Sequence, residues 1–458
     1  MGRPFVRIVD SALYYLPIST ITPLKFGRVT VTELECLRVR MTVESDGRTY
    51  EGWGETPLNI PWAWPEQAGA AVRTPAVRGL CSRIADAWRE HGARGHALEL
   101  GHQFLEEELP QVWAAARAAE APGIPWLAAL LCAAPFDLAL HDAFGHAVGR
   151  PVYETYSRDF LGADLADFYE VSSSTPGAGK SGKQFRDRYP DHYFPHPAPA
   201  FIPVWHLVGC ADAIEAGAGH STSLREWITR DGLRRLKVKL CGTSHRWDYE
   251  RLSAVGSLAA ELGVEALSVD FNGTAPNADY VTALLDRWKI EAADGYRLLR
   301  YVEQPFAPGA TVGSDEIGRV TSRIPVVLDE GASSWRDVRA GFELGYSGVA
   351  LKTCKTQSAA MLSLCWAREH GMDVVVQDLT NPMLAQISHA QLGAHASPEI
   401  GIESNAMQFY PAASECEARV HPGLYRRRNG ILDLSTIKGP GFGYRLAEMQ
   451  RKLPERAA

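Results

Sequence analysis

The sequence lacks the features of a disulfide-stabilised, zinc-binding or membrane-spanning protein. Its eight cysteines are scattered over 458 residues and include no CxxC pair. This pattern is typical of reduced thiols in the cytoplasm rather than of a disulfide framework or a zinc site. The sequence contains no run of about 18 apolar residues, so no membrane span is predicted. We therefore expect a cytoplasmic protein without a membrane partner.

A basic excess and a complete phosphate loop are also missing. The net charge is -7 and the pI about 6.1. The sequence thus has no excess of basic residues to neutralise phosphates, and no nucleic-acid partner is expected. The one basic run, 425-YRRRNG-430, is interpreted as a solvated turn. The stretch 177-GAGKSGKQ-184 fails the GxxxxGK[ST] pattern because Gln184 stands where a Ser or Thr is needed, so no nucleotide site is expected there.

The length predicts two domains, and the first half has the pattern of an α+β domain. Strand-like alternation over 28-RVTVTELECLRVRMTVESDG-47 ends in an Asp-Gly hairpin signal and resumes over 48–58. Ala-rich helical sequence then runs to about residue 150. We assign residues 1–200 to this domain, with a long Gly/Pro-rich loop or insertion near 160–200.

From residue 201 onward, short apolar runs alternate with helix-length connectors. This rhythm predicts parallel βαβ units, and eight of them indicate a (β/α)8 barrel over 201–412. A doubly wound sheet is the structural alternative, but no glycine-rich first turn supports it. Residues 413–458 are expected to return to the first domain. The eight predicted strands lie at 204–209, 236–240, 266–272, 300–305, 325–331, 348–354, 373–379 and 400–405.

Ionisable residues stand at the ends of the second to sixth predicted strands. Their spacing is close to one βα unit, so we expect them at the carboxyl ends of adjacent strands, where such barrels hold their active sites. Any one acid could simply cap the helix that follows it. The residues, in strand order, are Lys237 and Lys239, Asp270 with Asn272, Glu303, Asp329 with Glu330, and Lys352.

Three of these carboxylates could converge on one metal ion. Asp270, Glu303 and Asp329 offer oxygen ligands only, which favours Mg²⁺, with Mn²⁺ as the alternative. Lys239 and Lys352 come from strands on opposite sides of the barrel, so a substrate on the metal would have one amine on each face. Crowding by Lys237 and the metal is expected to lower the lysine pKa toward working pH. The alternative is that the lysines are ion-pair partners of Glu303 or Asp329.

In this order and spacing the motifs resemble the enolase superfamily, specifically the mandelate racemase/muconate lactonising enzyme group. Lys352 on strand six, and the absence of a histidine in 376-VQDLTNP-382, are similar to its two-lysine branch. The resemblance covers most of the chain. Its motifs are 52-GWGE-55, 137-DLALHDAFGHAVGRPVYE-154, the KxK at 237–239, Asp270 with Asn272, 303-EQP-305, 329-DE-330 and 351-LKTCKTQ-357.

The resemblance implies a modified TIM barrel capped by an α+β domain built from both ends of the chain. It implies Mg²⁺ on Asp270, Glu303 and Asp329, and abstraction of the proton α to a substrate carboxylate to give a metal-stabilised enediolate. Lys239 and Lys352 would be the acid/base pair, and the outcome racemisation, epimerisation or cycloisomerisation. The alternatives are an acid-sugar dehydratase, an o-succinylbenzoate synthase-like lyase and, from another class, an inactive metal-binding scaffold.

Further residues are expected to bind or orient a small carboxylate substrate. Loops 19–27 and 57–65 are expected to lie over the site, where Trp62 and Trp64 either cover the substrate or pack in the core. His389 and His395 are interpreted as structural, and the protein is expected to be a homo-oligomer. The auxiliary residues are Lys237, Asn272, Glu330, Lys355, Gln377, Asp378, Asn381 and Glu403.

Overall fold

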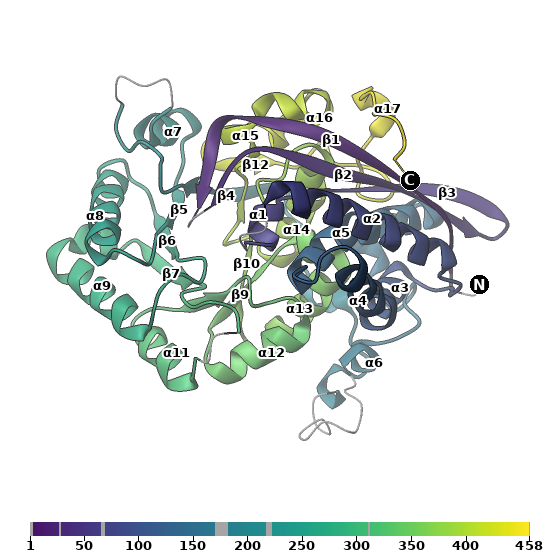
Figure 1. Ribbon diagram of the computed structural model, residues 1–458, viewed down its shortest axis with the longest axis horizontal. Coiled ribbons are helices and arrows are strands. Elements are labelled where there is room, and N and C mark those ends of the chain that lie inside the picture. The colour runs from purple at the N-terminus through teal and green to yellow at the C-terminus, as the bar shows by residue number, and fades with distance from the viewer. Residues whose placement is uncertain are drawn as a thin grey trace.

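The fold joins an antiparallel sheet to a closed parallel barrel (Figure 1). The computed structural model describes residues 3–26, 29–65, 69–169, 182–216, 222–309 and 312–457. Most of the stretch 177–184 that was rejected as a nucleotide loop lies outside these residues. Within the described chain, none of the eight cysteines forms a disulfide.

Three long strands form the first sheet, and their alternating side chains put one face against helices. The two central residues of the second turn, Asp46 and Gly47, have φ values of 50° and 74°. Such positive angles are those of the tight hairpin turn predicted from the Asp-Gly pair. The strands are β1 (Arg7–Phe26), β2 (Val29–Ser45) and β3 (Arg48–Pro57), paired antiparallel in that order.

The expectation of a loop at 19–27 is wrong for most of that segment. β1 continues to Phe26, because Leu24 and Lys25 pair with Val31 and Thr30 of β2 beyond a register shift that starts after Ser19. The long β1–β2 ribbon therefore reaches from the first sheet across the barrel (Figure 1).

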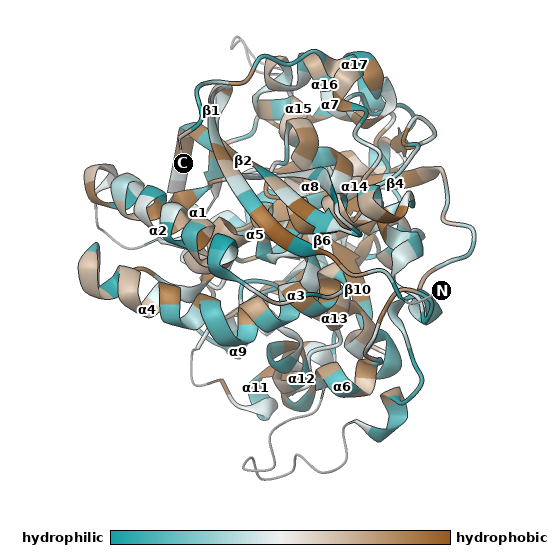
Figure 2. Ribbon diagram, turned by 90° about the vertical axis from the view of Figure 1, so that its right-hand side faces the viewer, coloured by the Kyte–Doolittle hydropathy of each residue, from teal (hydrophilic) through white to brown (hydrophobic). Residues whose placement is uncertain are grey.

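Helices cover one face of the sheet, and the outermost of them carry both hydrophilic and hydrophobic residues (Figure 2). The longest inner helix ends at Gly149, whose φ of 66° is the left-handed conformation of a helix stop. The helices of this part are α1 (Ile60–Ala63), α2 (Ala70–Glu90), α3 (Ala97–Gln103), a π-helical turn (Phe104–Glu108), α4 (Leu109–Ala119), α5 (Trp126–Val148) and α6 (Leu165–Tyr169).

Helix α5 joins the two parts of the molecule. It is long and apolar enough to cross a membrane, but nearly all of it is buried inside the protein, as in a core helix. The Asp142 carboxylate accepts the main-chain N–H of Trp53 in β3 at 2.9 Å and that of Phe442 near the end of the chain at 2.7 Å. One turn earlier, Asp137 accepts the N–H of Ser358 in the barrel at 2.8 Å. Each carboxylate thus satisfies donors from a different segment.

The barrel has eight parallel strands, and its closure is shown by the pairing of the last strand with the first. Every strand lies within or overlaps a predicted run, so the (β/α)8 prediction is confirmed. The strands are β4 (Phe201–Val208), β5 (Arg235–Lys239), β6 (Ala266–Asp270), β7 (Leu299–Glu303), β8 (Val326–Leu328), β9 (Gly348–Leu351), β10 (Asp373–Val376) and β11 (Ile402–Glu403).

A ring of helices surrounds these strands (Figure 1). Each strand-to-strand crossover carries at least one helix, as crossovers between parallel strands usually do. The helices are α7 (Leu224–Asp231), α8 (His245–Glu261), α9 (Ala278–Glu291), α10 (Ala293–Tyr296), α11 (Ser314–Thr321), α12 (Trp335–Leu344), α13 (Gln357–Glu369), α14 (Met383–Ala396) and α15 (Ala406–Phe409).

The end of the chain runs back to the first sheet through α16 (Glu415–Val420), β12 (Ile431–Asp433) and α17 (Leu446–Met449). The buried guanidinium of Arg38 in β2 bridges Glu55, at 2.5 Å, and Glu417 of α16, at 3.2 Å.

Two glycines allow β3 to lie directly against α5. A methyl group at Gly52 would overlap the main chain of Ala143, and one at Gly54 would overlap the carbonyl oxygen of Pro135. Because these neighbours are backbone atoms of a buried helix, they cannot move aside as a flexible side chain would. The GWGE motif therefore marks the contact between the sheet and its core helix.

We predict that Gly54→Ala lowers the free energy of unfolding by about 3 kcal/mol or more, because the helix must be displaced. Urea denaturation followed by circular dichroism measures this change. The control is Gly318→Ala in α11, where an added methyl meets nothing within 4 Å. It should be neutral or stabilising by about 0.5–1 kcal/mol. Equal effects of the two substitutions would contradict the packing argument.

Candidate active site

Charged side chains meet at the carboxyl ends of β5 to β9. The parallel register places Lys239 beside Asp270 and Asp270 beside Glu303. Asp329 follows β8 directly, and Lys352 follows β9. The structure thus brings the residues predicted from strand spacing to one end of the barrel.

Lys237 lies at the centre of this group, with only 1% of its surface exposed. Its Nζ is 2.9 Å from Asp270 Oδ2, 2.6 Å from Glu303 Oε1 and 2.7 Å from Glu403 Oε1. Burial alone would lower the pKa of Lys237, but these carboxylates together raise it well above its usual value. The same ion pairs with Lys237 and Lys239 overcome the effect of burial on Asp270 and lower its pKa. Lys237 is therefore a fixed, charged partner of the carboxylates.

The two lysines predicted to transfer protons are also ion-paired. Lys239 bonds to Asp270 and donates to Asn272 Oδ1 at 2.9 Å. Lys352 Nζ is 2.8 Å from Asp329 Oδ2, and Lys355 Nζ is 3.1 Å from Asp329 Oδ1.

In this structure an ion pair opposes the expected lowering of the Lys352 pKa. Burial would lower the pKa, but the adjacent Asp329 carboxylate outweighs burial and raises it above the usual value. The pairing with Asp329 is the alternative that the sequence left open.

Three of the remaining predicted residues, Glu330, Gln377 and Asp378, lie at the charged network or the cavity beside it, and Asn381 lies apart from them. Glu330 accepts from Asn272 Nδ2 at 2.9 Å, and Gln377 donates to Glu303 Oε2, so these two belong to the charged network. Asp378 accepts from the main-chain N–H of Asn405 at 3.0 Å. Asn381, by contrast, accepts from Leu379 N within its own loop and lines a separate small cavity.

Lys239 and Lys352 line one small cavity under the cap. Its volume is about 40 Å³, room for one or two water molecules, which is too small for a substrate with the side chains in these positions. The cavity is lined by Leu24, Asn59, Trp62, Leu207, Lys237, Lys239, Asn272, Lys352, Asp378, Leu379, Thr380 and Glu403.

The two tryptophans of the 57–65 loop have different roles. Trp62 Nε1 donates to Glu330 Oε1 at 3.3 Å, and the Lys352 ammonium lies 5.2 Å from the centre of a Trp62 ring. Trp62 therefore covers the site. Trp64 is 1% exposed and packs in the hydrophobic core of the first part of the chain.

The carboxylate oxygens at this site are the type of ligand that a hard divalent cation prefers. Asp270, Glu303 and Asp329 are fully buried and provide only oxygen, and Glu330 Oε2 nearby is buried without a hydrogen-bond partner in the described chain. Among the residues that the structure describes, no three His, Cys, Asp or Glu side chains form a ready-made metal cage. Instead the Lys237 ammonium joins the carboxylates. The metal-ligand assignment therefore stays a prediction.

One positioning residue was missed from sequence. Gln304 Oε1 accepts the main-chain N–H groups of Asp329, at 2.9 Å, and Gly331, at 3.1 Å. Gln304 thereby ties the end of β7 to the segment after β8 and fixes the spacing of Glu303 and Asp329. Its place directly after Glu303 in the EQP run was the available signal. Both histidines interpreted as structural bond to main-chain carbonyls, His389 to Glu403 and His395 to Gln391.

Residues 221–450, about half of the chain, match the family model described as enolase C-terminal domain-like. A search of curated proteins gave no match. Solved structures with the same fold include the N-succinyl Arg/Lys racemase from Bacillus cereus ATCC 14579, at a TM-score of 0.63 and 16% identity over 97% of each chain. The dipeptide epimerase from Enterococcus faecalis V583, complexed with Mg and L-Leu-L-Tyr, has a TM-score of 0.62 and 15% identity over 95% of this chain and 99% of that one. The 2-chloromuconate cycloisomerase from Rhodococcus opacus 1CP has a TM-score of 0.59 and 19% identity over 97% and 100%.

We predict that Lys237→Met, which keeps the volume but removes the charge, lowers the free energy of unfolding by about 3–5 kcal/mol, because buried carboxylates lose their shared cation. Chemical denaturation measures the change. Lys289→Met on the exposed face of α9 is the control and should change stability by less than about 0.5 kcal/mol. A loss at Lys237 as small as that of the control would show that the cluster does not depend on this ammonium.

Proposed function

The chain belongs to the enolase superfamily, in its mandelate racemase/muconate lactonising enzyme group, and from this premise we propose that it abstracts the proton α to a substrate carboxylate. The resulting enediolate would be reprotonated or would close a ring, so the enzyme would be a racemase, an epimerase or a cycloisomerase.

One observation carries this proposal: Lys239 and Lys352 line the same cavity from strands on opposite sides of the barrel. An α-carbon held between them would have an amine on each face. One lysine would take the proton while the other, still charged, delivers one, which inverts the centre. This arrangement favours racemisation or epimerisation, because each direction of the reaction needs both groups. The Lys352–Asp329 ion pair must separate for Lys352 to take part.

Asp270, Glu303 and Asp329 would hold Mg²⁺ or Mn²⁺ at the carboxyl ends of their strands. When bound, the ion supplies positive charge for the oxygen atoms of the enediolate. Lys237 would remain as a fixed cation beside these carboxylates, and Gln304 would keep Asp329 aligned.

The lining of the cavity supports a substrate with one carboxylate and a partly apolar body. Leu24, Trp62, Leu207 and Leu379 supply the apolar wall. An acid-sugar dehydratase is less well supported, because polar residues of the lining that would hold hydroxyl groups, such as Asn272 and Asp378, are hydrogen-bonded within the protein.

We predict exchange of the substrate α-proton in D₂O. Purified enzyme with Mg²⁺, incubated with a library of N-acyl amino acids, dipeptides and acid sugars, should incorporate deuterium into recovered substrate, measured by NMR and mass spectrometry. Lys239→Ala and Lys352→Ala should each reduce epimerisation by about 10²–10⁴-fold, the usual contribution of general acid–base catalysis. The exposed-lysine variant Lys289→Ala is the control.

Activity that survives both substitutions would contradict the assignment of the lysines. Absence of exchange across the library, in protein that binds Mg²⁺, would favour the inactive scaffold.

We predict that calorimetric titration detects one Mg²⁺ site in the wild type and that Asp270→Asn weakens it by about tenfold or more, because one anionic ligand is lost. Asp279→Asn on the surface of α9 is the matched control and should leave the affinity unchanged. Chelation by EDTA should stop turnover, and added Mg²⁺ should restore it. Unaltered affinity in Asp270→Asn would place the metal elsewhere.

A further inference from the structure

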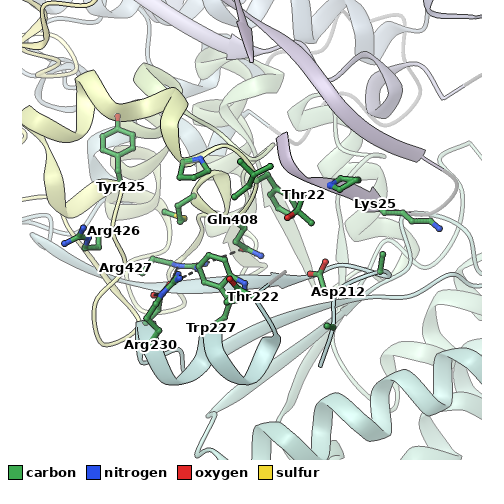
Figure 3. A pocket seen from close by; sticks show the side chains of 18 of the residues that line it. Thr22, Lys25, Asp212, Thr222, Trp227, Arg230, Gln408, Tyr425, Arg426 and Arg427 are labelled. Carbon is green, nitrogen blue, oxygen red and sulfur yellow. Dashed lines mark hydrogen bonds and ion pairs between the residues drawn. The ribbon is translucent and has the colours of Figure 1, made fainter. Parts of the chain in front are cut away.

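A second cavity lies beside the lysine cavity and is not used by the proposed reaction (Figure 3). It has a volume of about 980 Å³, in the range of small-molecule sites. Residues from three parts of the chain line it: the end of β1, residues 211–213 and 222 with α7, and residues 407–411 with the basic run 425–428.

The lining is strongly cationic in a chain whose net charge is -7. Five basic side chains against two carboxylates leave a net charge of +3 in the cavity. The carboxylates are Asp212 and Asp231, and the cations are Lys25, Arg230, Arg426, Arg427 and Arg428.

Arg427 is the fixed element of this lining. It is 2% exposed, so the interpretation of the basic run as a solvated turn is wrong for Arg427, whereas Arg426 and Arg428 are exposed. Its Nη1 contacts His206 Nδ1 at 2.9 Å, and its Nη2 lies 2.8 Å from Asp231 Oδ2. Its charge is paired with Asp231, and its Nη1 also bonds to Ser404 O and Gln408 Oε1, so the guanidinium is held in place at the edge of the cavity.

Asp231 neutralises only one of the two guanidinium groups that it holds. Arg230 pairs with the same carboxylate at 2.8 Å. The two guanidinium carbons also lie over the ring of Trp227, 3.9 Å from its centre for Arg230 and 5.0 Å for Arg427. Two like charges are thus held on one aromatic ring, and Figure 3 shows them pointing toward each other. An anion in the cavity would offset the positive charge that Asp231 leaves uncompensated.

The other three cations are exposed and make no ion pair with any described residue. Lys25 comes from the cap, whereas Arg426 and Arg428 come from the end of the chain. They line the same cavity around the buried arginine, so they could close around an anion from two sides. Guanidinium groups bind phosphate through paired N–H donors, which gives direction as well as charge.

We propose that this cavity is a binding site for a small molecule that carries a phosphate group. The excess of +3 suits a dianion better than a single carboxylate. The apolar side chains of Ile21, Pro23 and Phe409 line the same cavity and would contact the body of the ligand. The site does not depend on the reaction at the lysine cavity. Because Lys25 follows Leu24, which covers that cavity, a phosphate between Lys25 and the arginines would also hold the end of β1 in place.

The test is isothermal titration calorimetry of the full chain with phenyl phosphate and with inorganic phosphate at low and high ionic strength. The double variant Arg426→Gln/Arg428→Gln removes two exposed charges and leaves Arg427 untouched. We expect its Kd for phenyl phosphate to rise by about tenfold or more, as the loss of charge-assisted contacts implies. Lys25→Gln should also weaken binding. Wild-type affinity should fall as salt increases.

The matched control is Arg246→Gln/Arg419→Gln, which removes two surface arginines outside the cavity. It should keep the wild-type Kd, and unchanged thermal unfolding of both double variants shows that they are folded. Trp227→Phe should remove the fluorescence change that accompanies binding. Equal Kd values in the two double variants, or no binding of either phosphate, would overturn the site. Benzoate that binds as tightly as phenyl phosphate would overturn the assignment to a dianion.

Discussion

A buried ammonium group shared by several carboxylates is the constraint on which the mouth of the barrel depends. Lys237 touches Asp270, Glu303 and Glu403 and is almost completely removed from water. Carboxylates this close together repel one another strongly in a medium of low polarity, and no solvent is present to relieve them. A cation within the cluster therefore stabilises the fold. A strand with two lysines on one face is costly alone and becomes stabilising only beside these acids.

The cap is what removes this cluster from water. Trp62 lies over Lys352 and reaches Glu330, and Leu24 closes the cavity from β1. These two contacts come from residues far apart in the chain, so they require a cap whose position is fixed. Helix α5 provides that position, since Asp137 and Asp142 bind backbone groups of the barrel and of the chain end. The packing of the cap and the charge of the site are therefore parts of one arrangement.

Sequence spacing could predict which strand ends carry charge, because each βα unit returns the chain to the same end of the barrel. It could not predict which ammonium pairs with which carboxylate. The direction of the Lys352 pKa depends on a 2.8 Å contact with Asp329, and strand spacing does not fix side-chain distances at that scale. The sequence does not distinguish Trp62 from Trp64. Their roles differ only in the fold, where Trp62 faces the barrel site and Trp64 packs in the core. Arg427 appeared to be solvated for the same reason, since burial by α7 and α15 is a tertiary effect.

The end of β1 connects the two cavities of the molecule. Leu24 lines the lysine cavity and Lys25 lines the cationic one, as expected for neighbours in a strand, whose side chains point to opposite faces. A movement of the end of β1 would therefore shift both residues. A ligand in one cavity that binds more tightly when the strand is in this position would therefore strengthen the binding of a ligand in the other cavity that prefers the same position. The effect of each ligand on the affinity of the other is equal by thermodynamic necessity. The size of this effect is limited by the difference in each ligand's affinity between the two positions of the strand. For a ligand in the cationic cavity, that difference depends on its contact with Lys25.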